Sequence, residues 1–313
     1  MIRIFKSQDE KLLEQSIITP NCWVALTDPT SSELRTISEQ FHIELDDLKA
    51  PLDEEERSRI VVEDNYTLIL VDIPVIEERN GKDWYVTIPM SIILAEQVIF
   101  TVCLADTPIL TTFMKGRVRG FYTHMKTRFI LQILYKNASL YLQYLRNIDK
   151  KSEELERNLQ RATKNREILE LRELEKSLVY FTTSLRSNEI VLEKLLRNDK
   201  VKKYPEDTEL LEDVIIENKQ AIEMANIYSG ILSGTLTAFA SVISNNLNIV
   251  MKFLATVTIV LSIPTMVASF YGMNVNMAGV PFAADPYGFW YVILSAVLLS
   301  IIVAIIFARK NMF

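Results

Sequence analysis

Histidine and cysteine, which build many catalytic and transition-metal sites, are nearly absent from this sequence. Among 313 residues there are two histidines, His42 and His124, and two cysteines, Cys22 and Cys103. The cysteines form no CxxC pair and no disulfide framework, so we expect both to be buried thiols. Neither histidine belongs to a recognisable metal or nucleophile pattern. An enzyme is therefore the least supported class of function.

The sequence also lacks a concentrated basic surface and a nucleotide-binding loop. Its formal net charge is −6, with 34 Lys and Arg against 40 Asp and Glu. A general nucleic-acid-binding protein needs clustered positive charge to neutralise phosphates, so we expect no nucleic-acid partner. No GxxxxGK[ST] motif indicates coupling to nucleotide hydrolysis. Charges in segment 1–15 stand where a secretory signal needs an apolar core, so the N-terminal domain is expected to stay in the cytoplasm.

Charge is missing from most of the C-terminal part. Two segments, 253–270 and 289–308, contain no charged side chain and have about the length (~20 residues) that spans a hydrocarbon core. A buried hairpin of a soluble core is the alternative. The second segment is apolar on all sides, which favours two transmembrane helices. Neither segment has an ionisable residue suited to a proton relay.

The basic residues beside these segments predict their orientation. Lys252 precedes the first span, Arg309 and Lys310 follow the second, and the loop 271–288 has no basic residue. Basic residues favour the cytoplasmic side, so both termini are expected inside and the loop outside the cell inner or plasma membrane. Residues 309–313 would then be a basic cytoplasmic tail.

The first part of the chain, 1–107, has the pattern of a compact α/β domain. Runs rich in β-favouring residues, separated by turn residues, lie at 22–27, 66–71, 85–94 and 98–103. A helical segment is expected near 31–41. The pattern indicates the fold class and leaves the strand order open.

Residues 108–252 are expected to form a stalk of long helices. Mostly apolar residues step by threes and fours, as in packed helices, at Leu134, Ala138, Tyr141, Leu145, Ile148, Ser152, Leu155 and Leu159, and again at Leu171, Leu174, Leu178, Phe181 and Leu185. A break near 162–166 predicts an antiparallel helical hairpin. The helix that begins near Thr208 has no strong stop signal before Tyr271. At 1.5 Å per residue it would reach roughly 90 Å, enough to leave the cytoplasm and cross a bilayer.

A stripe of small and polar residues follows this last helix into the first span. Its members alternate in steps of three and four: Gly234, Thr237, Ser241, Ser244, Asn248, Met251, Ala255, Thr258, Ser262, Thr265 and Ser269. Such steps keep one face of a gently supercoiled helix. Small residues and hydroxyls also pack membrane helices together, so the spacing leaves helix packing and a pore lining open.

A pore lining would need several copies of the chain, because two spans cannot enclose a channel and a symmetric ring can. Hydroxyls and amides without fixed charge suit a cation that keeps its water shell. Mg²⁺ sheds its waters reluctantly, which makes it the preferred candidate.

The residues that end the first span, Tyr271, Gly272, Met273 and Asn274, resemble the signature of the CorA family of divalent-cation (magnesium) channels and transporters. The family's Gly-Met-Asn stands at the outer end of the first of two C-terminal spans, as here. The resemblance covers essentially the whole chain. It implies a funnel-shaped homopentamer, with an α/β cytoplasmic domain, long helices and two transmembrane helices embedded in lipid.

The resemblance also implies roles for individual residues. Gly272, Met273 and Asn274 would form the selectivity filter, in which Asn274 presents its side-chain carbonyl to the hydrated ion and Gly272 supplies a tight backbone. Asn248 and Met251 match the family's cytoplasmic constriction. The full set expected to line the pore is Asn248, Met251, Ala255, Thr258, Ser262, Thr265 and Ser269.

The family closes when cytoplasmic Mg²⁺ binds between neighbouring subunits. Asp46 and Asp47 resemble its acidic pair, with a further acidic run at 53–57, and Asp213 occupies the matching place on the long helix. The resemblance therefore implies Mg²⁺ both as the transported ion and as a regulatory ligand of Asp46, Asp47 and Asp213, since carboxylates are suitable hard ligands. Solvated surface charge is the alternative for each residue.

The loop after the signature departs from the family pattern. Many members carry acidic residues there, commonly in a Met-Pro-Glu-Leu stretch, whereas 275–281 has none and Asp285 is the only charge in the loop. The choice among Mg²⁺, Co²⁺, Ni²⁺ and Zn²⁺ therefore stays open. Two other hypotheses remain: a proton-coupled Zn²⁺ transporter of the same architecture, and a membrane-anchored coiled-coil scaffold.

Overall fold

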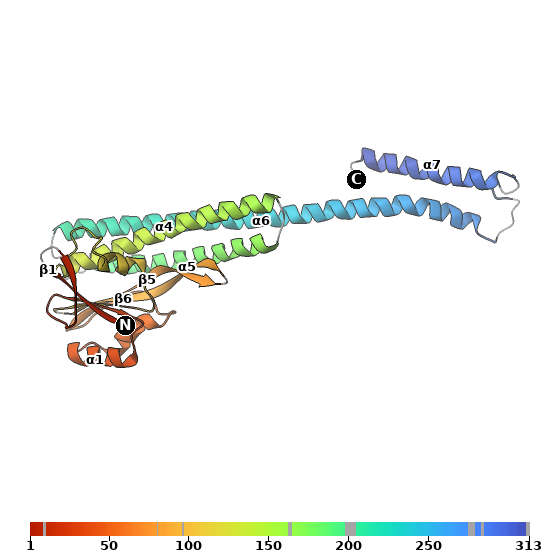
Figure 1. The fold of residues 1–313 in the computed structure, drawn as a ribbon. Helices are drawn as coiled ribbons and strands as arrows, with labels where there is room; N and C mark the ends of the chain where they lie inside the picture. The colour runs from red at the N-terminus through yellow and green to blue at the C-terminus, as the bar shows by residue number, and fades with distance from the viewer. Residues whose placement is uncertain are drawn as a thin grey trace. The chain divides into compact units, whose positions relative to one another are not determined.

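The computed structural model describes residues 1–8, 11–79, 81–95, 97–161, 165–197, 205–274, 279–282 and 285–310. The chain forms two compact units, Met1–Leu236 and Thr237–Phe313. The first holds the sheet and the helices that cover it (Figure 1). The second holds two apolar helical segments.

A mixed sheet, seven-stranded in the described part of the chain, is the framework of the first unit. Its strands are β1 (Ile2–Gln8), β2 (Lys11–Gln15), β3 (Trp23–Thr27), β4 (Arg59–Val62), β5 (Tyr66–Arg79), β6 (Lys82–Ala95) and β7 (Ile99–Cys103). They lie in the order β2-β1-β3-β7-β6-β5-β4. β3 and β7 pair in parallel, with Trp23 opposite Ile99, and the other neighbours are antiparallel.

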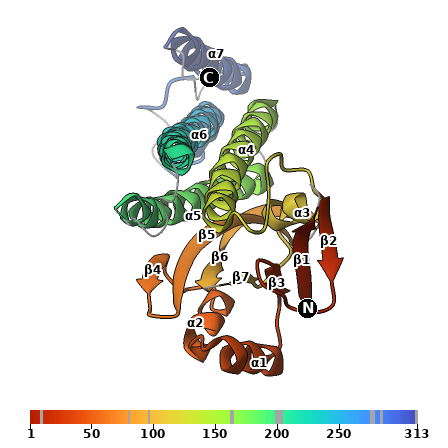
Figure 2. The same ribbon diagram turned by 90° about the vertical axis from the view of Figure 1, so that its left-hand side faces the viewer.

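Helices cover both faces of this sheet (Figure 2). On one face lie α1 (Ser31–Phe41), α2 (Leu45–Lys49) and the 3₁₀ turn η1 (Ala50–Leu52). On the other lie α3 (Pro108–Met114), α4 (Lys126–Arg161) and α5 (Asn165–Leu196). Strands with helices on both sides must be apolar on both sides, which explains why β3 and β7 are buried along almost their whole length.

Each face has its own apolar core. Under α1 and α2, Leu34 and Ile37 are packed in one buried cluster with Val24 and Phe100 of the strands. On the opposite face Trp23 is fully buried and makes edge-on contacts with the rings of Phe113, Phe121 and Phe129. The Trp23 indole N–H donates to Thr101 Oγ1 at 2.9 Å, so its one polar atom is satisfied.

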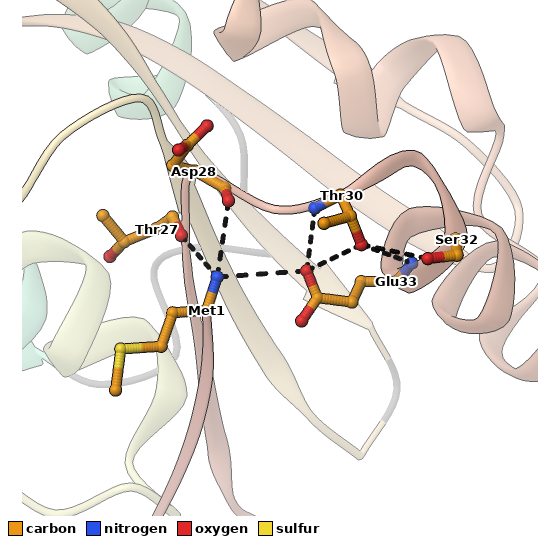
Figure 3. A network of polar contacts seen from close by, with 6 residues as sticks. All are labelled: Met1, Thr27, Asp28, Thr30, Ser32 and Glu33. Carbon is orange, nitrogen blue, oxygen red and sulfur yellow. Dashed lines mark hydrogen bonds and ion pairs between the residues drawn. The ribbon is translucent and has the colours of Figure 1, made fainter.

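The start of α1 is fixed by a capping box (Figure 3). The Glu33 N–H donates to Thr30 Oγ1 at 3.3 Å, and the Thr30 N–H donates to Glu33 Oε2 at 2.7 Å. The Met1 ammonium donates to Thr27 O at 2.7 Å and lies 3.9 Å from the same Glu33 carboxylate. These bonds lower the pKa of Glu33, with the Thr30 N–H as the main cause. They satisfy backbone donors that a helix start would leave free.

The predicted helical hairpin is confirmed. α4 ends at Arg161 and α5 begins at Asn165, while 162–164 lie outside the described residues. All residues predicted for its seam are buried except Ser152, which is half-buried. The ring of Phe181 lies 5.0 Å from that of Tyr141 across the two helices.

A buried amide joins α5 to the sheet where β4 has ended. The last residue pair between β4 and β5 is Arg59 and Leu70, so the backbone of Asp72 has no strand partner on that side. Asn188 replaces it: its Nδ2 donates to Asp72 O at 2.8 Å and its Oδ1 accepts from the Asp72 N–H at 2.9 Å. Asn137 of α4 also donates to Asp72 O, at 2.9 Å. The helices thus supply the bonds that a longer β4 would make.

The long helix α6 (Pro205–Tyr271) belongs to both units. Within the first unit it lies along α4 and α5 (Figures 1 and 2) and buries Leu211, Val214, Ala221 and Ala225. Asn218 Nδ2 donates to Leu185 O of α5 at 3.1 Å. The helix begins a few residues before the predicted Thr208, because Pro is well tolerated in a first helical turn.

The second unit contains the rest of α6 and the helix α7 (Gly288–Arg309). α6 and α7 are the two helices, within the described residues, that are long and apolar enough to cross a membrane. Pro264 lies inside α6 without ending it.

The strand-like runs and the helix predicted for the first domain match β3, β5, β6, β7 and α1. β1, β2, β4 and α2 were not predicted, whereas α3 lies at the start of the region 108–252 that was expected to be helical. Cys22 and Cys103 are buried as expected, and burial raises the pKa of the Cys103 thiol to about 12. Both are therefore unreactive core residues.

Replacing Asn188 with Ala should weaken the first unit. The change leaves the part-buried Asp72 N–H without its acceptor, which costs about 1–3 kcal/mol. We expect a lower thermal midpoint of the full-length protein, followed by tryptophan fluorescence because Trp23 is buried in this unit. Thr183→Ala is the control, since its exposed hydroxyl donates to its own helix at Val179 O. Equal shifts in both variants would contradict the role of Asn188.

The carboxyl of Asp72 should make stability depend on pH. Burial raises its pKa, against the opposing effect of hydrogen bonds with Ser184 and Ser58. The folded state therefore holds the proton more tightly than the unfolded chain, and stability falls as the pH rises through the folded pKa. Asp72→Asn cannot ionise and should be more stable than the wild type at neutral pH.

This advantage of Asp72→Asn should disappear below the unfolded pKa of about 3.9, where the wild-type carboxyl is protonated in both states. Thermal midpoints measured across a pH series test this, with the exposed Asp64→Asn as the matched control. An advantage of equal size at acid and neutral pH would show that ionisation is not its cause.

Candidate functional site

The polar stripe predicted on the long helix is exposed along its whole length in the single chain. Every member from Gly234 to Ser269 is exposed. Large apolar side chains beside it are exposed as well, among them Leu247, Leu254 and Leu261, the last with 67% of its surface accessible. So much contiguous apolar surface on a helix indicates contact with lipid or with further copies of the chain.

Several hydroxyls of the stripe donate to their own helix. Ser241 donates to Thr237 O at 3.1 Å, Thr258 to Leu254 O at 2.8 Å and Ser262 to Ile259 O at 2.8 Å. A hydroxyl that has given its proton to the backbone still has lone pairs on its oxygen. The stripe therefore presents uncharged acceptors, which suit donors such as the water molecules around a cation.

The Gly-Met-Asn residues continue directly from the last turn of α6. The Gly272 N–H donates to Ala268 O at 3.0 Å and to Ser269 O at 3.2 Å. A Cβ added to Gly272 would lie 3.5 Å from Ala268 O, an ordinary contact. Met273 and Asn274 are exposed. The backbone of one chain thus does not demand glycine here, and the role implied for Gly272 stays a prediction.

The loop after Asn274 is described only in part, because Val275, Asn276, Met277 and Ala278 lie outside the described residues. The hydroxyl of Tyr271 donates to Pro281 O at 3.1 Å, which connects the end of α6 to the loop.

Asp285, the only charged residue in the sequence of that loop, accepts hydrogen bonds from backbone N–H groups at the start of α7. Asp285 Oδ1 accepts from the Tyr287 N–H at 2.8 Å, and Asp285 O accepts from the Gly288 N–H at 3.0 Å. Sequence reasoning missed this contribution and that of Gly288.

The three acidic residues proposed for regulation differ in their surroundings. Asp46 and Asp213 are exposed. Asp47 is largely covered: the Tyr66 hydroxyl donates to its Oδ2 at 2.6 Å, and Arg59 lies 3.8 Å from its Oδ1. Burial, together with this bond to Asp47, raises the pKa of Tyr66 well above its ordinary value.

One chain does not bring these carboxylates together. Asp46 and Asp47 belong to α2 and Asp213 to α6, and these helices lie on opposite faces of the sheet (Figure 2). Nowhere among the described residues do three or more His, Cys, Asp or Glu side chains gather in a way that could hold a metal ion. A metal held by α2 and α6 together would need two copies of the chain.

A soluble α/β domain, a set of long helices and a C-terminal apolar helix define an integral membrane protein. The chain belongs to the CorA-like Mg²⁺ transporter protein family, whose model matches residues 20–309. Members of this family are ion transporters, so the protein is a transporter and not an enzyme. The predicted family is thereby confirmed, as is the predicted combination of an α/β domain, long helices and a C-terminal apolar helix. The homopentamer stays a prediction.

Individual relatives cover nearly the whole chain. The cobalt/magnesium transport protein CorA of Methanocaldococcus jannaschii is 29% identical over 299 residues, which are 92% of this chain and 90% of that protein. The magnesium transport protein CorA of Helicobacter pylori is 22% identical, with the same coverage.

Solved structures show the same architecture. The complete structure of the CorA magnesium transporter from Methanocaldococcus jannaschii superimposes with a TM-score of 0.87 at 26% identity, covering 100% of this chain and 99% of that one. The full-length CmaX protein, at 13% identity and a TM-score of 0.73, shares the fold.

Proposed function

We propose that copies of this chain form a membrane pore that conducts Mg²⁺, and also Co²⁺, into the cytoplasm. One observation carries the proposal: an unbroken stripe of small and uncharged polar residues on α6 leads to Gly272, Met273 and Asn274 in a member of the CorA-like family. The names of the relatives, a cobalt/magnesium and a magnesium transport protein, support the choice of ions.

The pore is a homopentamer in this proposal, with the α6 stripes facing one another around its axis. The complete exposure of the stripe in one chain supports this arrangement, because five such faces can surround a water-filled path. The apolar sides of α6 and the whole of α7 then contact lipid or neighbouring helices. Lys252, Arg309 and Lys310 mark the cytoplasmic side, and the loop lies outside.

The ion passes with its water shell largely intact. Mg²⁺ holds its waters tightly, so acceptors that bond to those waters cost less than ligands that replace them. A ring of Asn274 side-chain carbonyls at the outer mouth selects the hydrated ion, and the hydroxyls of Thr258, Ser262, Thr265 and Ser269 continue this lining inward. The membrane potential drives entry, supplying about 4.6 kcal/mol for a divalent ion at 100 mV.

Asn274→Ala should abolish most Mg²⁺ flux into proteoliposomes, because it removes the amide carbonyl from every subunit. Asn246→Ala is the matched control: Asn246 is also exposed on α6 but lies two residues from Asn248, on a different side of the helix from the stripe. We expect near-normal flux for the control. Full flux through Asn274→Ala would refute the role of Asn274, whereas no flux through the wild type would favour the scaffold hypothesis, in which the spans only tether the helices.

The same assay separates a channel from a proton-coupled carrier. Flux of Mg²⁺, Co²⁺, Ni²⁺ and Zn²⁺ is measured with and without a pH gradient. A channel conducts in both conditions, because neither span has an ionisable side chain for a proton relay. Flux of Zn²⁺ that requires the gradient would instead support the alternative transporter.

We also propose that cytoplasmic Mg²⁺ closes the pore by binding between neighbouring copies. Asp46 and Asp47 of one copy and Asp213 of the next would hold it. The exposure of Asp46 and Asp213 supports this, since both are accessible to another chain. Tyr66 and Arg59 orient the Asp47 carboxylate beside them.

Replacing Asp46 and Asp213 together with Asn should weaken inhibition by Mg²⁺ on the cytoplasmic side, because Asn keeps the shape and removes the charge. We expect the inhibitory concentration to rise about tenfold, the effect of losing ~1.4 kcal/mol of binding. Glu212→Gln, an exposed neighbour on α6, is the control. Unchanged inhibition in the double variant would refute the assignment.

A further inference from the structure

The loop that follows the Gly-Met-Asn residues closes onto α7 through a contact that only glycine allows. Gly288 is the first residue of α7. A Cβ built on it would lie 2.2 Å from Phe282 O and 3.3 Å from the Phe282 carbonyl carbon. Both are backbone atoms, so any larger residue at 288 must push the loop backbone away from the helix.

Phe282 is held in place from two sides. Its φ is 61°, in the left-handed region that a bulky aromatic residue rarely adopts. Its ring lies 5.5 Å from the ring of Tyr291 in the first turn of α7. Its carbonyl oxygen also accepts from the Asp285 N–H at 3.3 Å. A strained conformation persists only where surrounding contacts hold it, and here those contacts come from the start of α7 and from Asp285 just before it.

The neighbouring residue connects this contact to the end of α6. Pro281, whose ring restricts its backbone, accepts the hydrogen bond from the Tyr271 hydroxyl at 3.1 Å. Tyr271 is the last residue of α6 and is followed directly by Gly272. A shift of the Phe282 backbone is therefore passed through Pro281 to Tyr271, three positions before Asn274.

We propose that Gly288 is a positioning residue for ion recognition: its close approach to Phe282 places the loop so that the Tyr271–Pro281 bond holds the end of α6. The inference rests on the proposed function of Asn274. Amides that accept bonds from the waters of one ion must be placed to within about 0.5 Å, so their support has to be rigid. Gly288 supplies that support from the adjacent helix.

Gly288→Ala in the full-length protein tests this, with Gly279→Ala as the matched control. Gly279 lies in the same loop, and a Cβ there meets nothing within 4 Å. We expect Gly288→Ala to raise the Mg²⁺ concentration for half-maximal flux roughly tenfold, while Gly279→Ala leaves it unchanged. A purely structural role would lower the amount of assembled protein and leave this concentration unaltered.

Tyr271→Phe provides a second test that leaves Gly288 in place. It removes the hydroxyl that donates to Pro281 O and should also raise the Mg²⁺ concentration for half-maximal flux. Tyr287→Phe is its control, because this tyrosine lies in the same loop with 65% of its surface exposed.

Three outcomes are distinguishable. A raised Mg²⁺ concentration for half-maximal flux in Gly288→Ala and Tyr271→Phe, with unchanged values in the controls, supports the inference. If both variants keep the wild-type Mg²⁺ concentration for half-maximal flux while Asn274→Ala loses flux, the inference is overturned and the proposed function stays intact. Absence of Mg²⁺ flux in the wild type refutes the proposed function, and the inference that rests on it fails as well.

Discussion

The structure depends on one helix, α6, whose side chains must be compatible with water at one end and with lipid at the other. In its first part α6 lies along α4 and α5 and buries Leu211, Val214, Ala221 and Ala225. Beyond Lys252 it carries no charged side chain, and most of its residues are exposed. A helix satisfies its own backbone hydrogen bonds, so it needs only a change of side chains to pass from water into lipid. This property allows a soluble α/β domain and a membrane segment to share one continuous element.

Both proposed ion sites require more than one copy of the chain. The stripe on α6 is exposed along its whole length in one chain, so its oxygen acceptors are accessible to further copies. Asp47 and Asp213 lie on helices that cover opposite faces of the sheet, so one ion cannot reach both in a single copy. Conduction and regulation would then be coupled by assembly, because the same packing of copies that closes the ring would complete the regulatory sites.

The site residues that could be predicted are those with a strong periodic or positional signal. The steps of three and four identified the stripe and the buried seam of α4 and α5, because an exposed or buried face of a helix leaves a repeat in the sequence. Asn274 was proposed from its resemblance to a family signature and its position after an apolar span, and its role stays a prediction. Gly288 belongs to no such repeat. Its importance comes from Phe282 O, which the folded loop brings within 2.2 Å of where a Cβ of residue 288 would lie.

Sequence patterns were sufficient for the family, the α/β class, the helical hairpin and the apolar segments, because burial and membrane insertion act on local runs of side chains. They were insufficient for the strand order, which places β3 beside β7 although many residues separate them. They were also insufficient for Asn188, whose amide replaces a missing strand partner of Asp72. Such contacts depend on which segments meet after folding, and side-chain periodicity carries no information about residues so far apart in the chain.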